Sequence, residues 1–133
     1  MPFDAPQRSN HDSELLAQAK NALVRRGWVQ GQYSHDDGRL CAVAALAIAC
    51  GNRRFGHPSR TQRRLARLLA SELPHWGWFS CWMSGYFRVK GYNDAPHTGY
   101  DDVMDMYDRA IMRQDEKAWS LLVHSSVQRD PIL

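Results

Sequence analysis

The feature that most constrains the fold is an uncharged run of eleven residues, 40–50, which reads Leu-Cys-Ala-Val-Ala-Ala-Leu-Ala-Ile-Ala-Cys. Alanine is the best helix former, and Gly51 supplies the left-handed residue that commonly ends a helix. Because the run is apolar on every side, we expect a helix that is buried all round. It falls well short of the roughly 20 residues that cross a bilayer, so we predict the centre of a soluble core and no membrane association.

Length and composition indicate one cytoplasmic domain. A chain of 133 residues is close to the modal domain size and can bury a sizeable core. The three cysteines are an odd number, and the polar, proline-interrupted N-terminus does not have the pattern of a signal peptide. Both facts favour reduced thiols and the cytoplasm. The net charge of +3 permits an acidic partner without requiring one.

Helical periodicity predicts three amphipathic helices around the central one. They are expected at residues 13–26, 59–73 and 98–113. Ser59 opens the third helix with a capping-box pattern that is completed by Gln62. The stretch 28–38 has loop chemistry, and Asp36 or Asp37 can cap the central helix. The expected fold class is therefore all-α, a single compact bundle of about five helices.

The remaining segments are predicted with less regular structure. Residues 74–92 are rich in aromatic side chains but interrupted by glycines, so we expect a short helix around 78–84 and an extended piece at 86–90. Residues 115–124 have a helical pattern that either continues the preceding helix or folds back. A flexible arm at 1–11 and a frayed tail at 125–133 would leave 12–124 as the helical domain.

Three short stretches carry a resemblance to known proteins. They are Gly27-Trp28-Val29-Gln30-Gly31, Cys41 at the head of its alanine-rich helix, and Tyr92-Asn93-Asp94-Ala95-Pro96 with Thr98 and Val103 after it. Together they resemble an uncharacterised family of small proteins common in actinobacteria and their phages, over roughly residues 14–112. The chain departs from the family pattern at Ala44, where the family has Gly, and at Tyr92, where it usually has Trp. The resemblance implies a compact helical domain and a phage or prophage source, and it implies no activity.

A cysteine-dependent enzyme is one alternative that the residues raise. Cys41 would lie in the first turn of its helix, where the helix dipole lowers a thiol pKa, with His97 as a base and Asp94 to orient it. None of the local signatures of cysteine enzymes surrounds Cys41, however, and a cysteine within an Ala/Leu/Ile run is far more often a small buried hydrophobe. We therefore expect a non-enzymatic protein and keep the enzyme as the alternative.

Metal and cofactor motifs are missing from the sequence. Cys41 and Cys50 are nine residues apart, which places them on opposite faces of a helix. No Cys-x-x-Cys, His-Glu-x-x-His or glycine-rich phosphate loop is present. We expect neither a metal nor a cofactor.

Two surfaces are candidates for binding a partner, a basic one and an aromatic one. The basic stripe recurs at intervals of three and four on one face of the helix 59–73, and it comprises Arg60, Arg63, Arg64 and Arg67, with Arg53 and Arg54 upstream. The aromatic candidates are Trp76, Trp78, Trp82 and Tyr86. The stripe can equally be paired by the chain's own aspartates or face water, and the rings can belong to the core.

The function we predict is a non-enzymatic interaction or regulatory protein, encoded by a phage, that binds a host protein through these two surfaces. The alternative partner is DNA or RNA, which the basic stripe would contact at the phosphates. The sequence leaves the identity of the partner and self-association open.

Overall fold

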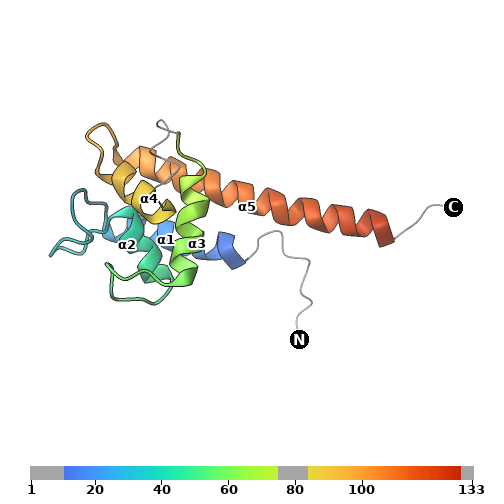
Figure 1. The fold of residues 1–133 in the computed structure, drawn as a ribbon, viewed down its shortest axis with the longest axis horizontal. Helices are drawn as coiled ribbons and strands as arrows, with labels where there is room; N and C mark the ends of the chain where they lie inside the picture. The colour runs from blue at the N-terminus through green and yellow to red at the C-terminus, as the bar shows by residue number, and fades with distance from the viewer. Residues whose placement is uncertain (1–10, 75–83, 130–133) are drawn as a thin grey trace.

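The computed structural model describes residues 11–74 and 84–129, with side chains to residue 124. Within these ranges the chain forms five helices and no strand, which confirms the all-α prediction (Figure 1). The helices are α1 (His11–Arg26), α2 (Ala42–Ala49), α3 (Arg60–Ala70), α4 (Gly85–Asp94) and α5 (Tyr100–Arg129). In the part of the chain that the structure describes, no helix is both long and apolar enough to cross a membrane.

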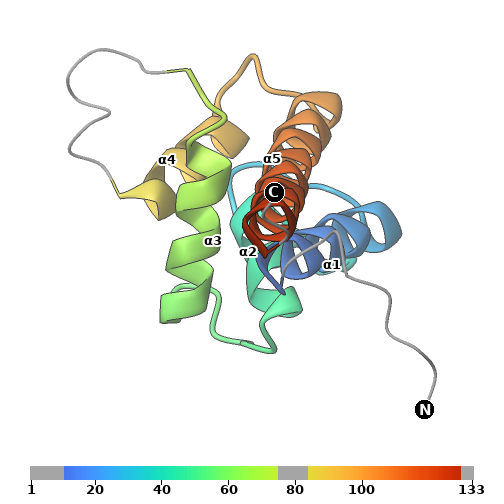
Figure 2. The ribbon, with the colours of Figure 1, turned by 90° about the vertical axis from the view of Figure 1, so that its right-hand side faces the viewer.

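Helix α2 lies at the centre of the bundle, between α1 and α3 (Figure 2). Every residue from Ala42 to Ala47 is buried, as the apolar run predicts. The helix is shorter than the run, because Cys41 is its N-cap and accepts a hydrogen bond from the Ala44 amide at 3.4 Å. The expected cap by Asp36 or Asp37 is wrong, since the Asp37 carboxylate accepts from the Arg39 amide at 3.1 Å within the preceding loop.

Helices α1 and α5 pack antiparallel. Ser13 Oγ donates to Asp115 Oδ1 at 2.7 Å, and Lys20 Nζ lies 2.5 Å from Asp108 Oδ1 seven residues later on α1. Residues 115–124 continue the preceding helix, so α5 runs as one helix to Arg129. The end of α5 therefore includes part of the stretch 125–133 that was predicted to be a frayed tail. Because α1 begins at His11, the end of α5 projects past it (Figure 1).

Helix α4 corrects one prediction. Residues 86–90 are helical and not extended, because Ser84 caps the helix by accepting from the Phe87 amide. The glycines at 85 and 91 suggested a break, but Gly85 serves a close approach of α4 to α3. A Cβ at Gly85 would lie 2.7 Å from the Cα of Arg67. The helix expected around 78–84 lies outside the described residues except for Ser84.

Helix α3 begins as predicted. The Ser59 side chain accepts from the Gln62 amide at 3.2 Å, and Gln62 Oε1 accepts from the Ser59 amide at 3.0 Å, which is a capping box. Leu65, Ala66 and Leu69 are buried against the core, so the opposite face of α3 carries the basic stripe to the surface.

Candidate functional site

Asn93, at the end of α4, joins three segments of the chain. It is 0% exposed, and its Oδ1 accepts from the Trp28 indole nitrogen at 2.6 Å and from the Ala42 amide at 2.9 Å. Its Nδ2 donates to the Val29 carbonyl at 3.1 Å. One buried amide thus satisfies an unpaired N–H at the start of α2 and fixes the loop after α1.

Asp94 extends this network to the surface. Its Oδ1 accepts from the Gly31 amide at 2.8 Å and from Asn93 Nδ2 at 2.9 Å, and its Oδ2 pairs with Lys90. Burial alone would raise the pKa of Asp94, but the bonds from Lys90, Gly31 and Asn93 outweigh burial and lower the pKa. The Lys90 ammonium also lies 5.2 Å from the centre of the Tyr33 ring.

Gln30 completes what we call the motif hub, the group formed by Trp28, Gln30, Asn93 and Asp94. Gln30 Nε2 donates to three carbonyl oxygens, each within 3.1 Å. One belongs to Asn93 at the end of α4, and the others belong to Ala95 and Thr98 just after it. The hub residues are among those on which the family resemblance rests. Their shared hydrogen bonds indicate that these motif residues hold the fold together.

Cys41, the candidate nucleophile, is 0% exposed. Burial raises the pKa of its thiol, with smaller opposing contributions from the Ala44 amide and Lys90. Asp94 is engaged in the hub, and His97 is exposed, with no hydrogen bond to Cys41 or Asp94 among the described residues. The structure therefore does not assemble these three residues around an accessible thiol. In residues 11–74 and 84–129, no three His, Cys, Asp or Glu side chains are grouped so that they could hold a metal ion.

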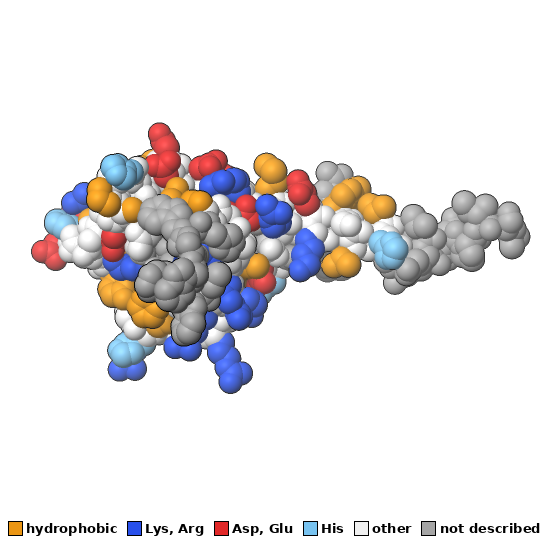
Figure 3. All heavy atoms as spheres, turned by 45° about the horizontal axis from the view of Figure 1, so that its top comes forward, with side chains coloured by type: hydrophobic (Ala, Val, Ile, Leu, Met, Phe, Trp, Pro, Cys, Tyr) orange, Lys and Arg blue, Asp and Glu red, His pale blue; other side chains and the backbone are white. Residues whose placement is uncertain are grey.

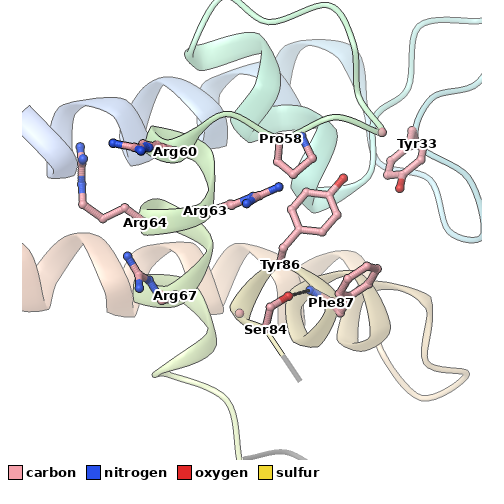
Figure 4. A pocket seen from close by; sticks show the side chains of 11 residues that line it. Tyr33, Pro58, Arg60, Arg63, Arg64, Arg67, Ser84, Tyr86 and Phe87 are labelled. Atoms are coloured by element: carbon pink, nitrogen blue, oxygen red, sulfur yellow. Dashed lines mark hydrogen bonds between the residues drawn. The ribbon is translucent and has the colours of Figure 1, made fainter. Parts of the chain in front are cut away.

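The basic stripe lies in a groove between α3, the start of α4 and the loop before α3 (Figure 4). The groove has a volume of about 890 Å³. Its lining residues are Tyr33, Gly56, Pro58, Arg60, Arg63, Arg64, Arg67, Ser84, Gly85, Tyr86 and Phe87. No carboxylate is among these described lining residues, so their net charge is positive.

One arginine of the stripe is neutralised within the chain. Arg64 holds the Asp12 carboxylate with two hydrogen bonds, Nη2 to Oδ1 at 2.8 Å and Nε to Oδ2 at 3.2 Å. Within the described ranges, Arg60, Arg63 and Arg67 have no ion pair. Three guanidinium groups of the groove are therefore available to an anionic ligand.

The opposite side of the groove is aromatic. The Tyr86 hydroxyl donates to the Phe55 carbonyl at 2.7 Å, and burial, with the neighbouring Tyr33 as a second cause, raises the pKa of Tyr86. Phe87 meets Tyr86 edge to face at 5.7 Å between ring centres and is 59% exposed. The groove thus has an apolar surface beside its arginines, and Arg63 extends towards Tyr86 (Figure 4).

The structure brings together only part of the predicted recognition surface. The four arginines of the stripe and Tyr86 line the groove, whereas Arg53 and Arg54 are exposed in the loop before it and are not among its lining residues. Trp76, Trp78 and Trp82 lie outside the described residues. Sequence reasoning missed Tyr33, Pro58 and Phe87. Phe87 could have been found from Ser84, since serine is a favoured N-cap and would place Phe87 in the first turn of a helix that begins at Gly85.

The fold and the site define a small all-α protein with a buried motif hub and a basic, aromatic-sided groove. The chain belongs to DUF6197, a family of unknown function, whose model matches residues 7–113. This confirms the expected membership of an uncharacterised family, and the match includes both the hub and the groove. No curated protein and no solved structure is detectably similar to the chain.

Proposed function

We propose that the protein is a non-enzymatic interaction protein that binds an acidic segment of a host protein in the groove. The observation that carries the proposal is a set of three arginines, Arg60, Arg63 and Arg67, which have no ion pair among the described residues. They line a groove whose described lining has no carboxylate. Guanidinium groups bind carboxylates through paired, charge-assisted hydrogen bonds, and three within one groove favour an acidic ligand.

The proposed setting is a phage or prophage protein that regulates its partner in the host cytoplasm. The family resemblance supports the phage source, and the odd number of cysteines supports a reducing compartment. Fractionation of host cells that express the chain at native level is expected to place it with cytoplasmic markers.

A charge-matched pair of triple variants tests the groove. Binding of a fluorescein-labelled peptide of twelve glutamates is measured by anisotropy at low and moderate salt. Replacing Arg60, Arg63 and Arg67 by Gln is expected to weaken binding at least tenfold, or about 1.4 kcal/mol. Glutamine keeps part of the apolar stem, so the melting temperature should change little.

The control replaces three other exposed arginines, Arg25, Arg53 and Arg54, by Gln. It removes the same charge and is expected to change affinity less than twofold. Equal losses in the two triple variants would show that net charge alone attracts the peptide and would contradict binding in the groove.

Nucleic acid is the second candidate partner, and the exposed ring of Phe87 beside the arginines favours it. Proteins that bind single strands combine a basic groove with aromatic rings on which bases stack. Binding of a labelled oligo-dT strand that falls steeply with salt, and more strongly than peptide binding falls, would establish this alternative.

A further inference from the structure

The two sides of the groove have different chemistry. Helix α3 contributes a basic wall of Arg60, Arg63 and Arg67, whereas Pro58, Tyr86 and Phe87 form an aromatic wall. Arg63 extends towards the aromatic wall, and Arg60 and Arg67 point away from it (Figure 4). A ligand that uses both walls must offer anionic groups on one side and apolar groups on the other.

The aromatic wall offers mainly carbon surface. The Tyr86 hydroxyl is already used by the Phe55 carbonyl, and Phe87 has no polar atom in its side chain. With 59% of Phe87 exposed, an apolar side chain can gain contact there. Acidic residues alone would leave this surface in water.

The spacing of the arginines matches an extended chain. Along a helix the rise from Arg63 to Arg67 is about 6 Å, and that from Arg60 to Arg67 is about 10.5 Å. Side chains on one side of an extended chain recur about every 6.8 Å, and the residue between them points to the opposite side. Two alternate acidic residues can therefore match the spacing of Arg63 and Arg67 along α3, with the residue between them directed to the opposite side, where Tyr86 and Phe87 line the groove.

The walls meet at one end of the groove. Gly85 packs so closely on Arg67 that a Cβ there would lie 2.7 Å from the Arg67 Cα and 2.9 Å from its amide nitrogen. At this end the two walls are therefore joined by backbone contact between α4 and α3.

We infer that the ligand is an extended protein segment in which acidic and apolar residues alternate. The inference rests on the proposed function, because it specifies the partner of the same groove. It adds that Phe87 contributes to the affinity and that the affinity depends on the order of residues in the ligand. Charge attraction alone would produce neither effect.

Three labelled peptides with flexible Gly-Ser ends test it. The first alternates three Glu with three Leu, the second has the same residues in two blocks, and the third alternates Glu with Ser. The alternating Glu-Leu peptide is expected to bind at least tenfold more tightly than either of the others. Phe87→Ser is expected to remove that advantage and to leave the affinity for the Glu-Ser peptide within twofold. An unchanged melting temperature is the check on folding for this exposed position.

The outcomes separate the inference from the proposed function. Equal binding of the three peptides, with sensitivity to the Arg60, Arg63 and Arg67 triple variant, would overturn alternation and retain an acidic partner. No binding of any acidic peptide would overturn both. Tighter binding of oligo-dT than of every peptide, lost in Phe87→Ser, would overturn both in favour of single-stranded nucleic acid.

Discussion

At the scale of single residues, the buried side chain of Asn93 connects three segments of the fold by hydrogen bonds. Its side chain is the partner of the Trp28 indole nitrogen, the Ala42 amide and the Val29 carbonyl. Removing a buried partner leaves each group unpaired, which costs about 1–3 kcal/mol per group.

Asn93→Ala is therefore expected to lower the free energy of unfolding by about 3 kcal/mol or more. Urea denaturation followed by far-UV circular dichroism measures the change. Asn21→Ala, on the exposed face of α1, is the matched control and is expected to stay within about 0.5 kcal/mol of the wild type. A loss below about 1 kcal/mol for Asn93→Ala would mean that the hub is not needed for stability.

Asp94 is expected to make stability depend on pH. Its folded-state pKa is lowered below the ordinary value of 3.8. Its contribution is therefore present above that value and is lost as pH falls through the folded-state pKa. Asp94→Asn should lower the free energy of unfolding by about 1 kcal/mol at neutral pH, and the difference from wild type should shrink below about pH 4.

Thermal melts between pH 3 and 7 measure this effect, with Asp36→Asn in the exposed loop as a control for the change of charge. A deficit of Asp94→Asn that is the same at pH 3 and pH 7 would show that the carboxylate acts through its shape and not its charge.

At the scale of elements, the contact between α3 and α4 depends on Gly85. Gly85→Ala would place a Cβ against backbone atoms of Arg67, so the helices must separate, at a cost of about 1–3 kcal/mol. Gly91→Ala on the same helix meets nothing within 4 Å and should stabilise by about 0.5–1 kcal/mol, because alanine favours the helix.

Chemical denaturation of the two variants measures this opposite pair of effects. Because both replace Gly by Ala in one helix, helix propensity is matched between them. Stabilisation by both would show that α4 can move away from α3 without cost.

Sequence periodicity predicted α1, α2, α3 and the first half of α5, because their apolar faces repeat with the period of a helix. It missed α4, because Gly85 and Gly91 have low helix propensity and the contact that requires Gly85 comes from another helix. The basic wall of the groove was predictable, since its arginines share one helix face. Of its aromatic wall only Tyr86 was predicted, because Pro58 and Phe87 meet the groove from segments far apart in the chain.

At the scale of the whole molecule, the end of α5 projects from the bundle with apolar side chains on several sides (Figure 3). Trp119, Leu121, Leu122 and Val123 are between 38% and 64% exposed. Ser13, near the start of α1, contacts Asp115, and α5 continues past this contact to Arg129. A helical segment of that length depends on tertiary packing for its stability.

We therefore expect backbone amides after residue 118 to exchange hydrogen at least about a hundredfold faster than those of residues 103–110, as local opening there needs little free energy. Native-state hydrogen exchange measured by NMR checks this. If the amides after residue 118 are as well protected as those of 103–110, and this protection is lost on tenfold dilution of the protein, a second copy of the chain covers the end of α5.

Helix α4 is held at both of its ends. Asn93 and Asp94 fix its last turn in the hub, while Gly85 rests on α3 and Tyr86 bonds to the loop before α3. The aromatic wall is thus preorganised before any ligand arrives. Association with the proposed ligand would then cost mainly the conformational entropy of the ligand and of the three arginine side chains.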